Sequence, residues 1–302
     1  MVTNSWLDEH MSNDVFTRIE PKTHDLGDGF MVRRVLPHAQ ARSVGPFVFF
    51  DHMGPVDLPP GKGMDVRPHP HIGLATVTWL FDGCIRHRDS LGSDQEIHPG
   101  EVNWMTAGRG IVHSERTPDW KRDEGGRMHG IQTWVALPKA DETVAPDFHH
   151  YASDQFPALE LPGVRLRLMA GSGWGAQSPV KVFAPTFFAE AHLQTGAELE
   201  LPPEHEEHGV YVVEGELRFG EQRLDAFDMG VHRGPDAPKL QAVTPSTVIL
   251  VGGAPLDGPR FVWWNFVASE RSRIDQAGRD WKDGRFDTVP GDDEEFIPLP
   301  EK

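Results

Sequence analysis

The chain has 302 residues, enough for two domains of ordinary size, and 38% of them are hydrophobic, enough to supply a core for each. With 46 acidic against 29 basic residues the net charge is -17, which disfavours nucleic acid and anionic membranes as partners, because both are bound through clustered Lys and Arg. The single cysteine excludes an intrachain disulfide and a cysteine-rich zinc site, while 31 glycines and 26 prolines disfavour a helical bundle.

We expect neither a signal peptide nor a membrane-spanning segment in this sequence. The N-terminal residues lack a basic stretch followed by an apolar one, so we expect no signal peptide. No apolar run approaches the roughly 18 residues of a membrane-spanning helix, and the longest, residues 47–50 and 248–251, have the length of strands. We therefore expect a cytoplasmic protein in a reducing compartment.

Short β-rich runs separated by Gly and Pro occur through most of the chain. Residues 74–81 end at an Asp-Gly turn, and residues 164–169 alternate apolar side chains with arginines, as a half-buried strand does. One helix is predicted late in the chain, from Ser269 as its N-cap to about Trp281, with Gly284 beyond its end. Many short strands and few short helices predict an all-β sandwich or barrel fold.

A weak internal repeat links the two halves. Residues 79–83 read Trp-Leu-Phe-Asp-Gly, and residues 211–215 read Tyr-Val-Val-Glu-Gly, so each closes a strand with the same aromatic, apolar, acidic and glycine order. We therefore predict two similar β-domains in tandem, at residues 1–145 and 146–302, with the seam in the Pro-, Asp- and His-rich stretch 137–162.

Two pairs of polar residues in the first half share the spacing i, i+2: His69 with His71, and His113 with Glu115. Alternate residues of a strand point to the same face, so each pair would direct both side chains into one interior. Two such pairs on neighbouring strands would supply three nitrogens and one oxygen, a ligand set that suits a first-row divalent ion. A six-coordinate ion would keep open positions for water or a substrate, as a catalytic site requires.

A single His-x-His pair is weak support for such a site, because pairs of surface histidines are common. The second pair favours a metal site over surface histidines. The Gly-Arg-Gly turn at residues 108–110 adds to this, because a hairpin-like turn there would fix the register of the strand that carries His113.

These residues lie in stretches that resemble the signature of the pirin family, a part of the cupin superfamily. The Met-Thr-Ala-Gly-Arg-Gly run at residues 105–110 is specific, and the similarity extends over most of the chain. The stretches that carry it are residues 67–71, 87–92, 99–115, 211–215, 249–256 and 263–267.

The resemblance implies a fold of two tandem cupin domains, which are jelly-roll-like antiparallel β-barrels that face each other. It also implies one metal ion in the N-terminal barrel, held by three histidines and one glutamate that correspond here to His69, His71, His113 and Glu115. The ion would most simply be Fe²⁺, although Mn, Co, Ni, Cu or Zn would also suit these ligands. Ala75 stands where the family often has an acidic residue, so no second carboxylate is expected at the metal.

Two functions follow from the resemblance. Bacterial pirins have been linked to quercetin 2,3-dioxygenase activity, which implies a metal-dependent dioxygenase for a flavonol-like substrate and O₂, with the metal as Lewis acid and Glu115 as the catalytic proton acceptor. Eukaryotic pirins are nuclear co-regulators, which implies the alternative of a non-catalytic, metal- or redox-sensing regulatory protein. In that case the acidic surface would meet a protein partner with a basic patch.

A second group of histidines precedes the strand at Tyr211. His205 and His208 flank two glutamates there, but the His-x-His spacing is absent, and His232 is the only further candidate ligand nearby. We interpret residues 205–208 as a solvated acidic loop and expect the second domain to bind no metal.

A few other residues are candidates for smaller roles. His52 follows an apolar strand and either lines the cavity or is an ordinary loop histidine, while His129 and Gln132 are expected to face inward. Cys84 follows a turn glycine with no cation beside it except Arg86, so we interpret it as structural.

Overall fold

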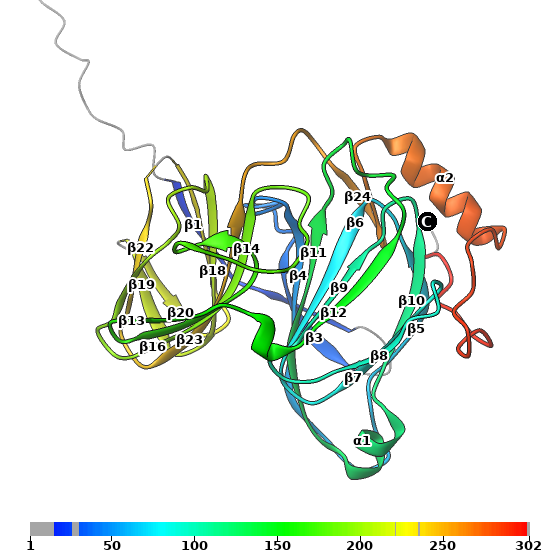
Figure 1. Cartoon of the computed structure of the whole chain (residues 1–302), viewed down its shortest axis with the longest axis horizontal. Helices are drawn as coiled ribbons and strands as arrows, with labels where there is room; N and C mark the ends of the chain where they lie inside the picture. Colours follow the sequence, from blue (N-terminus) through cyan, green and yellow to red (C-terminus); the bar gives the residue numbers. More distant parts are fainter. Residues whose placement is uncertain (1–14, 26–29, 221, 235, 301–302) are drawn as a thin grey trace, which may run out of the picture.

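The computed structural model describes residues 15–25, 30–220, 222–234 and 236–300 (Figure 1). The first domain consists of two antiparallel sheets that enclose an interior between them. The larger sheet has the order β12 (Asp147–Tyr151), β9 (Val102–Thr106), β6 (Leu74–Asp82), β11 (Gly126–Ala136), β4 (Phe47–Leu58), β3 (Met31–Leu36) and β2 (Lys22–Asp25). The smaller sheet has the order β5 (Asp65–His71), β10 (Ile111–Arg116), β7 (Ile85–Asp89) and β8 (Asp94–Ile97).

The second domain repeats this two-sheet plan. Its larger sheet has the order β1 (Val15–Ile19), β21 (Met229–Arg233), β18 (Glu207–Glu214), β23 (Ser246–Gly253), β16 (Thr186–Leu193), β14 (Val164–Gly173) and β13 (Ala158–Leu161), with β15 (Ala176–Gln177) beside β14. Its smaller sheet has the order β17 (Glu198–Glu200), β22 (Lys239–Ala242), β19 (Glu216–Phe219) and β20 (Gln222–Asp225). The predicted all-β architecture with two tandem domains is confirmed, although each domain is a pair of sheets and not a closed barrel.

The internal repeat marks equivalent places in the two domains. In the first domain β6 ends at Asp82 and is followed by Gly83, whose φ is +94°; in the second, β18 ends at Glu214 and is followed by Gly215, whose φ is +96°. Both glycines adopt the left-handed conformation that a side chain disfavours, so the same turn chemistry closes the central strand of each domain.

Each end of the chain packs against the domain that is distant in sequence. Near the N-terminus, β1 pairs with β21 of the second domain. Near the C-terminus, the hairpin of β24 (Phe261–Trp263) and β25 (Phe266–Ala268) and the helix α2 (Arg271–Lys282) return to the first domain, where Phe266 forms a parallel bridge with Ile72. The orange and red part of the chain in Figure 1 therefore lies beside β5 and β10. The division at residues 145 and 146 stays a prediction.

A shared apolar core joins the two domains. Phe47 and Phe50 of β4 meet Phe188 and Tyr211 of the second domain, with ring centroids 6.2 Å apart for Phe47–Phe188 and 4.9 Å apart for Phe50–Tyr211. All four side chains are fully buried, so this contact excludes water between the domains.

The predicted helix is present, but its N-cap is not Ser269. The helix α2 begins at Arg271 with Glu270 as its N-cap, and it ends before Gly284, whose φ is +66°. The hydroxyl of Ser269 donates instead to the buried carboxylate of Glu142, at 2.8 Å, and the Ser269 amide donates to the same group at 2.7 Å. A buried carboxylate needs such donors more than a helix end does, because water can satisfy the helix end.

Two short helical segments complete the fold: α1 (Asp119–Glu124) after β10, and a 3₁₀ turn at Ser153–Gln155 between the domains. Within the described part of the chain, no helix is both long enough and apolar enough to span a membrane.

Candidate metal centre

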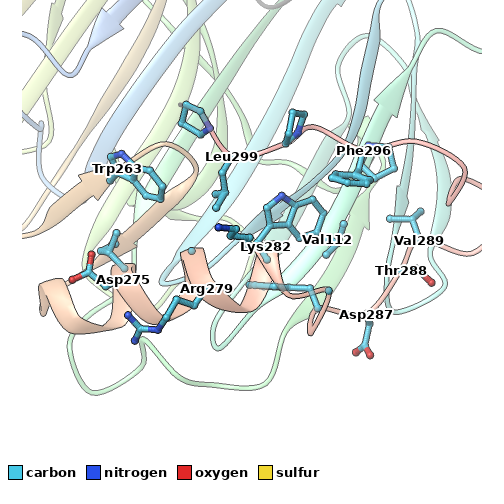
Figure 2. Close-up of a pocket in the computed structure, with 18 of the residues that line it drawn as sticks. Val112, Trp263, Asp275, Arg279, Lys282, Asp287, Thr288, Val289, Phe296 and Leu299 are labelled. Atoms are coloured by element: carbon cyan, nitrogen blue, oxygen red, sulfur yellow. The ribbon is translucent and has the colours of Figure 1, made fainter. Parts of the chain in front are cut away.

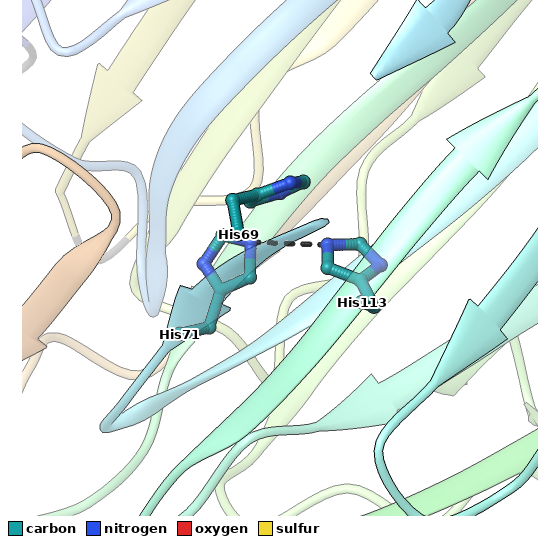
Figure 3. A group of neighbouring side chains, drawn as sticks. All are labelled: His69, His71 and His113. Atoms are coloured by element: carbon teal, nitrogen blue, oxygen red, sulfur yellow. Dashed lines mark hydrogen bonds between the residues drawn. The ribbon is translucent and has the colours of Figure 1, made fainter. Parts of the chain in front are cut away.

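Three histidines converge in the interior of the first domain. His69 and His71 are two residues apart on β5 and share a face, and the antiparallel pairing of β10 with β5 places His113 opposite His69. One ring nitrogen of each lies within 4.8 Å of the others, and Nε2 of His71 is 3.1 Å from Nε2 of His113 (Figure 3). The exposed fraction of each residue is 5% or less, so the group is shielded from bulk water.

Backbone carbonyl groups orient two of these rings. Nδ1 of His69 donates to the carbonyl oxygen of Arg67 at 2.9 Å, and Nδ1 of His71 donates to that of Asn265 at 3.0 Å. A carbonyl oxygen only accepts, so the proton of each neutral ring is on Nδ1 and the lone pair is on Nε2. Partners of this kind fix the tautomer and orientation of metal-binding histidines.

The third ring is oriented by a chain of side chains that ends at a carboxylate. Nε2 of His87 lies 3.1 Å from Oδ2 of Asp89, and Nδ1 of His87 lies 3.3 Å from Nδ1 of His113. In neutral His87 the proton is therefore on Nε2, so Nδ1 of His87 accepts the proton of His113 Nδ1. This leaves the lone pair of His113 on Nε2, beside Nε2 of His71.

Burial keeps all three rings neutral. Burial, together with the neighbouring imidazoles, lowers the pKa of His71 and His113 well below the ordinary value, and burial also lowers the pKa of His69. Burial alone would raise the pKa of Asp89, but hydrogen bonds from His87 and Ser93 outweigh it and lower that pKa. The three imidazoles are therefore neutral, and the side chains that orient His113 end at the ionised carboxylate of Asp89.

The three nitrogens form a donor set that fits one divalent metal ion. Imidazole suits Zn, Cu, Fe and Ni, and the 3.1 Å between the nitrogens of His71 and His113 is compatible with two adjacent bonds of about 2.0–2.1 Å each. Without an ion, lone pairs would face one another at this distance, so the cluster is better satisfied with a cation than without one.

Glu115 lies inside the domain but apart from the three histidines. Both carboxylate oxygens accept from Nε2 of Gln132, at 2.8 and 2.7 Å, and Oε1 also accepts from the hydroxyl of Thr78 at 3.3 Å. The register between β10 and β5 shifts between His113 and Glu115 because β5 has one extra residue there, whereas the pairing of β10 with β7 is continuous, so both side chains keep the expected i, i+2 placement on one face of β10. The carboxylate is outside the 4.8 Å group, and its role as a metal ligand stays a prediction.

Sequence reasoning missed the residues that orient the rings. His87 and Asp89 have the i, i+2 spacing of the ligand pairs, so that spacing was a usable signal. Asn265 offered no signal, because its backbone carbonyl makes the contact and it lies 194 residues from His71. Gln132 faces inward as expected.

His52 lies at the junction between the domains and not at the histidine cluster. Its Nδ1 is 2.7 Å from the hydroxyl of Tyr211, and its Nε2 is 2.8 Å from Nε2 of His129. Burial, with the neighbouring His129 and Arg33, lowers its pKa to about 3, so the ring is neutral and accepts the Tyr211 proton. The residue is buried, so the interpretation of His52 as an ordinary loop histidine is wrong.

Three histidines of the second domain, His205, His208 and His232, are buried, and among the described residues they do not form such a group. His205 and His208 have exposed fractions of 4% and 0%, so the interpretation of this segment as a solvated loop is wrong. Their Nε2 atoms donate to the carbonyl oxygens of Ser172 and Pro202, each at 2.9 Å. Among the residues that the structure describes, neither belongs to a set of three potential metal ligands within 4.8 Å.

A large cavity lies outside the histidine cluster, on the other face of the strands that carry it. Its volume is about 1340 Å³, and α2, β24 and the C-terminal segment form its walls, as Figure 2 shows with Trp263, Lys282 and Phe296. Its floor includes Pro68 and Val112, the residues before His69 and His113, but none of the three histidines. The cavity is thus a neighbour of the site and not its entrance.

Comparisons with known proteins agree on one family. The family model described as Pirin matches residues 29–135, and that described as Pirin C-terminal cupin domain matches residues 188–287. A "Pirin-like protein" of Caulobacter vibrioides is 48% identical over 93% of this chain and 98% of its own length. A structure titled quercetin 2,3-dioxygenase from Acinetobacter baumannii is similar with a TM-score of 0.87 and 34% identity, and the match covers 95% of both chains. A second structure with that title from the same organism has a TM-score of 0.84 and 27% identity, and the match covers 89% of this chain and 96% of the other.

Proposed function

Because this chain belongs to the pirin family of two-domain cupin proteins, we propose that it is a metal-dependent dioxygenase acting on a flavonol-like substrate and O₂. The observation that carries the proposal is the convergence of three buried Nε2 lone pairs from His69, His71 and His113. Similarity to structures titled quercetin 2,3-dioxygenase supports the choice of substrate class.

The proposed metal is one divalent ion, Fe²⁺ in the first place, with Mn, Co, Ni, Cu and Zn as alternatives to be tested. When bound, the ion would supply Lewis acidity and a template for the enolate oxygen of the substrate. His69, His71 and His113 would hold it, and Glu115 is the proposed fourth ligand. The three rings reach this arrangement with their tautomers already fixed, which lowers the reorganisation that binding requires.

Glu115 is also the proposed proton acceptor for the substrate hydroxyl. Gln132 of β11 and Thr78 of β6 donate to its carboxylate and hold it in the interior of the domain. A substrate hydroxyl directed at the carboxylate would give up its proton to Oε1 or Oε2 and be held as an enolate. Substitution Glu115→Gln removes the acceptor but retains the size of the side chain, and a general base of this kind contributes about 10²–10⁴-fold to the rate.

The direct test is turnover of quercetin by protein loaded in turn with each of the six metals. We expect loss of quercetin absorbance together with oxygen uptake, above the rate of the free metal, for at least one metal. His69→Ala should lose this turnover, whereas His149→Ala, which removes an exposed histidine elsewhere on the first domain, should retain it. No turnover with any metal, or equal turnover in His69→Ala, would refute the proposal.

One observation favours the alternative of a metal- or redox-sensing binding protein. His71 is held by the carbonyl of Asn265, which lies between β24 and β25, so the metal centre touches the segment that walls the outer cavity. A change in the metal's charge would act on this segment through the His71 ring. A pull-down of a cytoplasmic extract with Fe(II)- and Fe(III)-loaded protein tests this: a partner held in one state supports sensing, and equal capture in both, with turnover intact, contradicts it.

A further inference from the structure

A second cluster of potential metal ligands lies outside the domain interior, on the hairpin of β7 and β8. Ile85 pairs with Ile97 in this hairpin, so the next residues outward, Cys84 and His98, lie opposite one another. Glu96 is two residues before His98 and shares its face of β8. The register of one hairpin therefore brings a thiol, a carboxylate and an imidazole together, with no contribution from the histidines of the interior.

The ligand atoms of these three residues lie within 4.8 Å of one another. Sγ of Cys84 is 3.8 Å from Oε2 of Glu96, and Nε2 of His98 is 3.7 Å from the same oxygen. Bonds of about 2.3 Å to sulfur and 2.0–2.2 Å to oxygen at a tetrahedral angle separate the two atoms by about 3.5 Å. The observed separations exceed this by a few tenths of an ångström, which small rotations of two surface side chains can close.

The surroundings hold the carboxylate in place and leave the cluster open on one side. Nε1 of Trp120, on α1, is 3.2 Å from both carboxylate oxygens of Glu96, and its ring stacks against His98. Cys84 is buried, whereas the side chain of His98 is 46% exposed. An ion from solvent would thus reach His98 and Glu96 first, and the buried thiol would be its innermost ligand.

The electrostatics of the cluster favour a cation. Burial, and then the negative charges of Glu96 and Glu101, raise the pKa of the Cys84 thiol to about 12, against a smaller opposing effect of Lys121. The thiol is therefore protonated when no cation is present. A divalent ion would displace that proton to solvent and be bound by the thiolate, since metal ligation deprotonates a thiol outright.

We propose that Cys84, Glu96 and His98 form a second metal site, which takes a divalent ion with affinity for thiolate, Zn²⁺ above all. Three protein ligands leave one tetrahedral position for water. The thiolate distinguishes this site from the three imidazoles of the interior, so the two sites would prefer different ions. A bound ion would join the turn before β7, the end of β8 and, through Trp120, the helix α1.

Co²⁺ replaces Zn²⁺ as a spectroscopic probe, because a thiolate ligand adds an intense charge-transfer band that an all-nitrogen site does not give. We expect this band on titration of the full chain with Co²⁺, its loss on addition of Zn²⁺, and its absence in Cys84→Ser. His98→Ala and Glu96→Gln should weaken Co²⁺ binding in this band by about tenfold or more. His149→Ala, which removes an exposed histidine paired with Asp147 but far from any thiol in sequence, should leave the band unchanged.

The number of ions per chain separates this proposal from that of the interior site. After saturation with Co²⁺ and removal of free ions, we expect two ions per unaltered chain and one in Cys84→Ser. His113→Ala should retain the charge-transfer band even if the interior site is lost. Absence of the band from the unaltered chain at saturating Co²⁺, a measurement that needs no variant to fold, would overturn the proposal, as would a band that persists in Cys84→Ser.

Discussion

Both domains bury several histidines in the described part of the chain, five in the first and three in the second, yet their ring nitrogens have different neighbours. In the first domain, His69 and His71 lie two apart on one strand and His113 lies opposite them, so three rings share one face. In the second, His208 pairs across the sheet with His232, and their ring centroids are 5.8 Å apart. The third buried histidine described in the second domain, His205, lies before β18 begins.

The two domains also use their nitrogens in opposite ways. In the first domain the Nδ1 atoms of His69 and His71 donate to carbonyl groups, and the Nε2 atoms are directed at one another. In the second, the Nε2 atoms of His205 and His208 make the carbonyl contacts, and the ring of Phe187 packs against both, at 5.0 and 5.8 Å between centroids. The two domains therefore differ in which ring nitrogen is bonded to a carbonyl group, and among the described residues only the first domain brings potential ligand nitrogens of three histidines within 4.8 Å of one another.

The largest expected effect is on metal content. His113→Ala should remove the interior ion and reduce its content from about one per chain to background, because two nitrogens rarely retain a divalent ion against buffer. His208→Gln, the matched change in the second domain, should leave the content of this ion unchanged. Elemental analysis of Fe²⁺-loaded protein measures both, and a loss of iron in His208→Gln comparable to that in His113→Ala would erase the contrast between the domains.

The pH dependence of stability tests the second domain alone. Burial lowers the pKa of His208 to about 4, whereas in the unfolded chain it is about 6.5. Between these values the unfolded state binds a proton that the folded state excludes, so the free energy of unfolding falls as the pH falls from 6.5 to 4. A pKa difference of that size corresponds to a loss of up to about 3 kcal/mol from the free energy of unfolding.

His208→Gln should remove this part of the pH dependence, because Gln can still donate to the carbonyl of Pro202 but does not titrate. His52 has no interaction with His208 among the causes of its lowered pKa, so its contribution cancels and the difference between the two curves reports on His208 and its immediate neighbours. Urea unfolding at pH 7.5, 6, 5 and 4 is the measurement. Parallel curves for the two proteins would show that His208 is protonated without cost in the folded state.

The sequence predicted most of the interior site because the strand period alone selects it. His69, His71 and His113 converge as the i, i+2 spacing and the neighbouring strand require. The same period places Glu115 on the face of β10 that carries His113, where Gln132 and Thr78 donate to its carboxylate, and its role as a metal ligand stays a prediction. Spacing alone does not indicate which partner binds that carboxylate.

The two-domain β-fold could be predicted from the sequence, but the packing of each chain end against the domain that is distant in sequence could not. Turn residues and short apolar runs indicate two β-domains, and the two closing glycines, Gly83 and Gly215, mark their equivalence. No local pattern indicates that β1 joins the second domain or that Phe266 bridges to Ile72, because these contacts are long-range and depend on shape. For the same reason Asn265 as a partner of His71 was not predictable.

A smaller effect is expected at the contact between His87 and His113 in the first domain. His87→Ala removes the acceptor of His113 Nδ1 and the stacked contact of His87 with Phe148, whose centroid is 4.3 Å away. The ring of His113 would then be free to rotate, and loss of such a partner costs about 10–100-fold in metal affinity. His87→Gln keeps a carbonyl acceptor and should recover part of the loss.

A competition titration of Fe²⁺ or Zn²⁺ against a chelator measures this affinity, and the same titration of His205→Gln is the control from the second domain. If His87→Gln binds metal as weakly as His87→Ala, His87 acts through packing and not through the hydrogen bond to His113.

The smallest expected effect is at the contact that joins the two domains. Tyr211→Phe removes the hydroxyl that donates to Nδ1 of His52 at 2.7 Å and leaves that nitrogen buried without its donor. The cost of such a lost bond is about 1 kcal/mol, up to about 3 when the remaining partner cannot reach water. Urea unfolding of Tyr211→Phe, His52→Phe and the double variant gives the coupling energy between them. A double variant that is no less stable than Tyr211→Phe would place the cost in the unsatisfied nitrogen, whereas additive losses would mean that the two side chains stabilise their own domains and not the junction.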